Sequence, residues 1–142
     1  MNIFLDTSSL FKLYHSEAGT DELMAFFKSH KIENIFLAEI TLVEFSSVVW
    51  RKVRMKELDA KHAQVLIGKF DGDSKGFNFV PDNIKLKTTS QELLRKHWNM
   101  GLRTLDSLQL SSALSCSKQI HHFFTSDSVL SEIANMEGFD VK

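Results

Sequence analysis

The sequence predicts a single α/β domain over residues 1–142, built on a parallel β-sheet of about five strands with helices on both faces. Two observations carry this prediction. Short apolar runs alternate with longer segments in which apolar residues recur at helical spacing, which is typical of strand–helix–strand units. Polar residues that favour helix starts follow several of these runs, so a strand should lead through a sharp junction into a helix. Because crossovers between parallel strands are right-handed, all strands should end at one edge of the sheet.

The strands are predicted from their apolar centres. The first run meets a polar stretch at residues 6–9, and Pro81 stops the third strand because proline lacks a backbone N–H. A short run after Gly138 completes the sheet. The expected strands are residues 2–5, 34–38, 77–80, 121–125 and 139–141.

The helices between the strands are predicted from apolar spacing and capping residues. Threonine stands at the expected start of four of them, at positions 20, 41, 89 and 104. A turn is predicted at residues 71–74, and Gly101 is expected to end a helix in a left-handed conformation. Trp50 and Trp98 are assigned to the apolar faces of helices. The expected helices begin at about residues 10, 20, 41, 59, 89, 104 and 129.

Composition limits the possible classes of protein. A hydrophobic fraction of 43% with 25% charged residues is ordinary for a globular domain. The formal net charge is -1, so nucleic acid would have to bind a local basic patch. Cys116 is the only cysteine and no signal peptide or apolar run of membrane-spanning length is evident, so we expect a cytoplasmic protein without a membrane anchor.

Four acidic residues stand at the junctions where predicted strands end or helices begin. Asp6 and Asp127 follow the first and fourth strands, and each can be explained as a helix cap. Glu44 can be the last member of a capping box opened by Thr41, and Asp106 can favour a helix N-terminus. Ligands of open α/β sheets bind outside the carboxyl ends of the strands, so the four acids can alternatively converge on one crevice.

Such a convergence would predict a metal site. Carboxylates packed close together repel one another unless a cation neutralises them. Mg²⁺ and Mn²⁺ prefer oxygen ligands of this kind, and no cluster of cysteine or histidine competes for a softer metal. A divalent ion among carboxylates suits the hydrolysis of phosphodiester bonds.

Four motifs of the chain resemble those of PIN-domain ribonucleases, particularly the VapC-type toxins of prokaryotic toxin–antitoxin modules. In the order of the family they are FLDTSSL at 4–10, TLVEF at 41–45, LRTLDSLQL at 102–110 and FTSD at 124–127. The resemblance implies a PIN-like three-layer α/β/α fold with strand order 3-2-1-4-5. That order places Asp6 and Asp127 on either side of the switch point between strands one and four.

The resemblance also implies roles for individual residues. It assigns the metal site to Asp6, Glu44, Asp106 and Asp127. Thr7 and Ser8 match hydroxyls expected to orient Asp6 or a metal-bound water. Two positions depart from the family pattern: Gln109 stands where many relatives carry histidine, which we interpret as a packing difference, and Ser128 replaces a residue that is often lysine.

By this resemblance the protein is expected to be a Mg²⁺- or Mn²⁺-dependent endoribonuclease, the toxin of a VapBC-type pair. It would form a homodimer and bind a small VapB-like antitoxin whose C-terminal segment fills the acidic crevice, where a basic side chain could replace the metal. The alternative is a catalytically silent PIN-like scaffold that binds RNA or a partner. A haloacid-dehalogenase-like phosphatase is disfavoured because Ser8 stands where its second aspartate belongs, and a response-regulator receiver lacks its acidic pair.

Three basic residues are candidates for contact with RNA, whose backbone binding is largely electrostatic. Lys12 follows the first junction, although a solvated lysine is the favoured explanation of it. Arg51 can instead complement the dipole of its helix. Arg103 can pair either with a site acid or with a phosphate.

Overall fold

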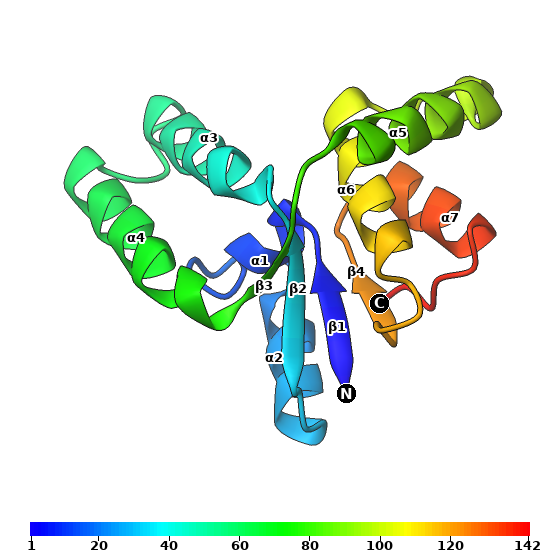
Figure 1. Cartoon of the computed structure of the whole chain (residues 1–142). Coiled ribbons are helices and arrows are strands. Elements are labelled where there is room, and N and C mark those ends of the chain that lie inside the picture. The colour runs from blue at the N-terminus through cyan, green and yellow to red at the C-terminus, as the bar shows by residue number, and fades with distance from the viewer.

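Four parallel strands form the central sheet of the computed structural model, which describes all residues from 1 to 142 (Figure 1). Their order is β3-β2-β1-β4, so the predicted order of the first four strands is confirmed. The first strand is central and pairs with β2 on one side and β4 on the other. The strands are β1 (Asn2–Leu5), β2 (Asn34–Ala38), β3 (Asn78–Val80) and β4 (His122–Phe124).

The prediction of a fifth strand at residues 139–141 is wrong, because this segment does not form a strand. Residues 139–141 lie beside β4, but they contribute only an isolated parallel bridge between Phe123 and Val141. The Phe123 N–H donates to the carbonyl of Asp140, and the Phe123 carbonyl accepts from the N–H of Lys142. Because Phe123 alone exchanges backbone hydrogen bonds with this segment, no ladder forms and the sheet has four strands.

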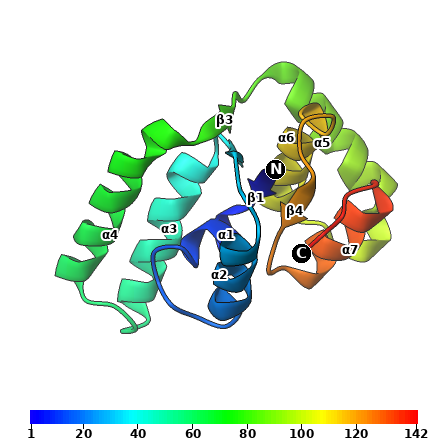
Figure 2. The ribbon, with the colours of Figure 1, turned by 90° about the horizontal axis from the view of Figure 1, so that it is seen from below.

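Helices cover both faces of the sheet (Figures 1 and 2). Helices α1 to α4 lie on one face, and α5 to α7 lie on the other. The helices are α1 (Thr7–Phe11), α2 (Thr20–Ser29), α3 (Thr41–Arg54), α4 (Ala60–Asp73), α5 (Ile84–Lys96), α6 (Thr104–Ser115) and α7 (Ser128–Met136), with single 3₁₀ turns η1 (Ser74–Gly76) and η2 (Trp98–Met100). The structure is therefore the predicted three-layer α/β/α arrangement.

Alternation along the strands divides the core into two parts. Ile3 and Leu5 of β1 pack with the helices of the first face, whereas Phe4 packs with those of the second. Successive side chains of a strand point to opposite faces, so a parallel sheet covered twice needs apolar residues at every position. All three side chains are fully buried, and each contributes roughly 1.5–3 kcal/mol to the stability of the fold.

A row of asparagine side chains crosses the edge of the sheet opposite the carboxyl ends of the strands. The Nδ2 atom of Asn34 donates to Asn2 at 2.9 Å, and that of Asn78 donates to Asn34 at 3.3 Å. The Nδ2 atom of Asn2 donates in turn to the carbonyl of Gln119, in the loop before β4, at 3.0 Å. The row therefore links β1, β2 and β3 to one another and to the loop that precedes β4.

Three helix boundaries differ from the prediction. Helix α1 begins at Thr7 and not at about residue 10, because Asp6 caps it. Helix α5 begins at Ile84, where the Oδ1 atom of Asn83 accepts from the N–H of Leu86 at 3.0 Å, and not at Thr89. The hydroxyl of Thr89 donates to the carbonyl of Lys85 one turn earlier, as it does inside a helix. Helix α4 continues through the predicted turn as far as Asp73, whereas Gly101 has the expected left-handed φ of 76°.

The two tryptophans were wrongly assigned to the core. The side chain of Trp98 is 80% exposed in η2, and that of Trp50 is 42% exposed. Their helical faces are apolar only in part, so spacing alone overestimated their burial. No helix of the structure has the length and apolar character needed to cross a membrane.

Candidate functional site

A cleft of about 760 Å³ opens at the carboxyl edge of the sheet. One wall is α3 and the other is formed by the starts of α6 and α7. All four predicted acids line this cleft, although they come from four separate segments of the chain: Asp6, Glu44, Asp106 and Asp127. The structure therefore brings together the residues that the sequence placed at strand ends and helix starts, while their catalytic role stays a prediction.

Asp6 lies at the end of β1 and is 4% exposed. It caps α1, because its Oδ1 accepts from the N–H of Ser9 at 2.8 Å, so the capping explanation is correct for this residue without excluding a site role. The hydroxyls of Ser8 and Thr125 also donate to its carboxylate, at 2.7 and 2.6 Å. Burial raises the pKa of Asp6 above its ordinary value, and these donors oppose the shift.

Glu44 is not part of a capping box. Thr41 is already the first residue of α3, and its hydroxyl faces inward without capping the helix. The Glu44 Oε1 atom instead accepts from the Thr7 hydroxyl at 3.2 Å and from Gln109 Nε2 at 2.7 Å. Burial raises the pKa of Glu44, the charges of Asp6 and Asp106 raise it further, and the two hydrogen bonds lower it.

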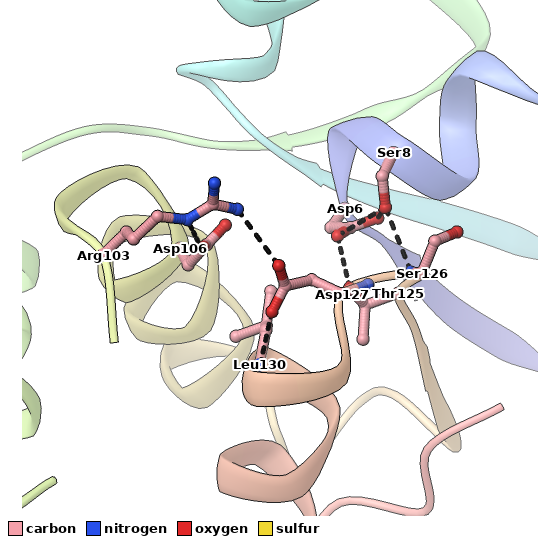
Figure 3. A network of polar contacts seen from close by, with 8 residues as sticks. All are labelled: Asp6, Ser8, Arg103, Asp106, Thr125, Ser126, Asp127 and Leu130. Atoms are coloured by element: carbon pink, nitrogen blue, oxygen red, sulfur yellow. Dashed lines mark hydrogen bonds and ion pairs between the residues drawn. The ribbon is translucent and has the colours of Figure 1, made fainter. Parts of the chain in front are cut away.

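Arg103 joins the two remaining acids (Figure 3). Its Nε lies 2.9 Å from Asp106 Oδ2, and its Nη2 lies 3.1 Å from Asp127 Oδ2. The other oxygen of Asp127 accepts from the N–H of Leu130 at 2.8 Å, so Asp127 also caps α7. These acids raise the pKa of Arg103, first through its hydrogen bond to Asp106. Of the two partners predicted for Arg103, the site acids are the ones it contacts.

The donor chemistry of the cleft fits a hard divalent cation, since the four predicted carboxylates line it without any sulfur or imidazole ligand. A fifth carboxylate in the lining, that of Glu17, is paired with Lys52. The positions of the side chains do not yet form a coordination shell: no three histidine, cysteine, aspartate or glutamate side chains stand close enough to share one ion. Arg103 supplies the positive charge between Asp106 and Asp127 instead. The metal therefore stays a prediction that rests on the donor set.

The other predicted residues are divided between two cavities. Ser8 contacts Asp6, as expected, whereas Thr7 contacts Glu44. Arg51 and Arg103 line the acidic cleft. Lys12 does not line it, but lies in a separate cavity of about 240 Å³ beside Gly19 and Phe26.

Gln109 was interpreted as a packing difference, and this interpretation is wrong. The side chain is 2% exposed, and its Nε2 lies within hydrogen-bonding distance of Glu44, Thr7 and Thr41. Its position three residues after Asp106 places both on one face of α6, a signal that the sequence offered. Thr41 and Thr125 were also missed as site neighbours, because their partners are distant in the chain.

The fold and the cleft define a class: an α/β/α domain with carboxylates at the switch point of a parallel sheet, where such folds bind ligands. A family model described as the PIN domain matches residues 3–136. The chain therefore belongs to the PIN domain family.

Solved structures share this fold along nearly the whole chain. FitAcB from Neisseria gonorrhoeae is 16% identical with a TM-score of 0.69, over 98% of this chain and 95% of that chain. The Mycobacterium tuberculosis toxin VapC20 is 17% identical with a TM-score of 0.71, over 96% and 95%. VapBC2 from Rickettsia felis is 14% identical with a TM-score of 0.66, over 100% and 98%. At these identities the likeness shows the fold alone. No curated protein sequence matches the chain significantly.

Proposed function

We propose that this protein is a Mg²⁺- or Mn²⁺-dependent endoribonuclease. The observation that carries the proposal is the arrival of four carboxylates from four segments in one cleft of a PIN domain. Support also comes from VapC20, a PIN-fold relative described as a toxin that cleaves the sarcin–ricin loop.

In this proposal Asp6, Glu44, Asp106 and Asp127 hold the ion. A bound divalent ion would supply an activated water and neutralise charge on the phosphate. Ser8 and Thr125 fix the carboxylate of Asp6 through their hydroxyls, so that it meets the ion in one orientation. Gln109 does the same for Glu44. No side chain is needed as a covalent nucleophile.

The proposed biological role is that of the toxin in a VapBC-type pair, acting in the cytoplasm as a homodimer. Several structures with this fold are complexes of such pairs, including VapBC-1 from Haemophilus influenzae and VapBC2 from Rickettsia felis bound to promoter DNA. The partner would be a small antitoxin that covers the acidic cleft. Expression of the toxin alone should arrest bacterial growth, and co-expression of the protein encoded beside it should restore growth.

Asp6→Asn tests the nuclease. Purified protein should cleave RNA with Mg²⁺ or Mn²⁺, lose cleavage in EDTA, and lose at least about 100-fold in rate as Asp6→Asn, because asparagine keeps the cap but not the charge. The matched control is Asp59→Asn, since Asp59 caps α4 in the same way, at 2.7 Å from the N–H of His62, outside the cleft. Cleavage that persists in EDTA, or in Asp6→Asn, would contradict the proposal.

A second candidate function is the silent scaffold. The bridge of Arg103 between Asp106 and Asp127 favours it, because the guanidinium already offsets part of the negative charge that would otherwise attract an ion. The scaffold predicts that the protein binds RNA or its partner with equal affinity with and without divalent ions, and shows no turnover with any of them. The same cleavage assay, run with Mg²⁺, Mn²⁺ and Co²⁺, separates the two functions.

A further inference from the structure

Arg103 is the feature of the cleft that the proposed chemistry does not use. It lies directly before α6 and bridges two carboxylates that come from different segments (Figure 3). Its two bonds, at 2.9 and 3.1 Å, end on the Oδ2 atoms of Asp106 and Asp127. One planar guanidinium thus spans two of the four acids.

The guanidinium and a divalent ion cannot hold these two acids together at once. Each Oδ2 already receives an N–H, and the guanidinium charge lies between the two carboxylates where an ion would bring its own. A second cation in that space would be repelled by the first, because like charges at short range disfavour each other. The two cations are therefore competing ligands of one pair of carboxylates.

The bridge is also free to open. The Arg103 side chain is 72% exposed and has no bond other than those to Asp106 and Asp127, so leaving them costs it no buried contact. Asp106 and Asp127 are 18% and 29% exposed and remain in the wall of the cleft when the arginine moves out.

We propose that Arg103 is an internal competitor for the divalent ion: it holds Asp106 and Asp127 in the metal-free protein and must leave them before an ion binds. The inference rests on the proposed function, since it concerns the same acids. It adds that the affinity of the chain for metal is set by an equilibrium between its own arginine and the ion. An apparent affinity falls in proportion to the fraction of molecules that are competent to bind.

The chain offers a matched control in Arg51. This arginine lines the same cleft from α3, but the structure gives it no ion pair. Removing Arg51 or Arg103 takes one positive charge from the cleft, whereas only the loss of Arg103 opens the bridge. The difference between the two variants therefore isolates the bridge from the general change in charge.

The test is the binding of Mn²⁺ to RNA-free protein, followed by electron paramagnetic resonance for wild type, Arg103→Gln, Arg103→Lys and Arg51→Gln. Arg103→Gln should bind Mn²⁺ roughly tenfold more tightly than wild type, an ordinary size for coupling between two ligands. Arg51→Gln should change the affinity less than about threefold, since its charge is not bonded to the acids. Arg103→Lys should fall between them, because an ammonium cannot form the planar fork.

A second measurement follows Arg103 itself. In wild type the Nε–H resonance of Arg103 should shift as Mg²⁺ is added, and it should do so over the same concentrations at which the ion binds. Two results would overturn the proposal that Arg103 competes with the ion: equal Mn²⁺ affinities for wild type and Arg103→Gln, or an Nε–H resonance that does not move while Mg²⁺ binds. Neither result would contradict the proposed nuclease function. If neither wild type nor Arg103→Gln binds Mn²⁺, the proposed metal-dependent function fails together with it.

Discussion

At the scale of single residues, the site is defined by donors that fix carboxylates. Asp6 has three such donors, and Glu44 has two. The acids themselves were predictable from the sequence, because they stand at strand ends and helix starts. Ser8 was also expected beside Asp6, but Gln109 and Thr125 were not predictable as donors, since they lie 65 residues from Glu44 and 119 residues from Asp6 along the chain. Only the fold brings these pairs together.

Gln109→Leu tests the role of the buried amide. Leucine has similar size but cannot donate to Glu44, so a half-buried carboxylate loses its shortest hydrogen bond. We expect a loss of about 1–3 kcal/mol in the free energy of unfolding, measured with urea. Gln109→His, which can direct one ring N–H at Glu44, should lose less.

Gln64 on α4 provides the comparison, because the same change there affects an exposed side chain. Gln64→Leu should stay within about 0.5 kcal/mol of wild type. Equal stabilities for Gln109→Leu and Gln64→Leu would show that Gln109 only fills space, as first interpreted.

At the scale of elements, apolar runs predicted all four strands within a residue at each end. Helix starts were less predictable, because the sequence offers competing caps. Asn83 and Thr89 both precede apolar residues of α5, and tertiary packing of Leu86 and Leu93 selects the earlier start. The fifth strand failed for a related reason: apolar character alone does not supply the repeated backbone bonds that make a ladder.

Asn83→Ala tests the observed start of α5. Alanine cannot accept from the N–H of Leu86, so we expect a loss of about 1 kcal/mol in the free energy of unfolding. Thr89→Ala should be neutral or slightly stabilising, because this half-buried position is inside the helix, where alanine is the better helix former. If urea unfolding shows a larger loss of stability for Thr89→Ala than for Asn83→Ala, the helix begins at Thr89 and not at Ile84.

At the scale of the whole molecule, the sequence predicted the layers, and the resemblance to a family supplied the strand order. Alternating strands and helices imply a covered parallel sheet, but several orders satisfy that pattern. The position of the cleft followed from the order, because the switch point lies beside β1.

The stability of the metal-free protein should fall as the pH rises from mildly acidic to neutral. Burial raises the pKa of Asp6 and Glu44, so their contribution is complete below the ordinary carboxyl pKa and is lost as the pH rises through the raised values. Glu137 acts in the opposite sense at lower pH: burial alone would raise its pKa, but Lys96 and His97 lower it, so its contribution is lost as the pH falls.

Thermal unfolding between pH 4 and 8 measures this profile. At neutral pH, Mg²⁺ should restore stability by about 2.7 kcal/mol at a hundred times its dissociation constant. Asp6→Asn should flatten the profile and weaken the response to Mg²⁺, whereas Asp59→Asn should keep both. If the stability of the metal-free protein instead rises steadily with pH, the pKa values of Asp6 and Glu44 are not raised in the folded protein.

The asparagine row at the far edge of the sheet has a consequence for the acids at the near edge. Three asparagine amides, hydrogen-bonded from strand to strand, favour a single register of the strands. A slide of one residue in the central strand would turn its side chains to the opposite layers, and Asp6 would point away from the cavity. The side chain of Asn2, which carries no charge and lies four residues before Asp6, therefore helps to keep the most deeply buried acid of the molecule directed into the cleft.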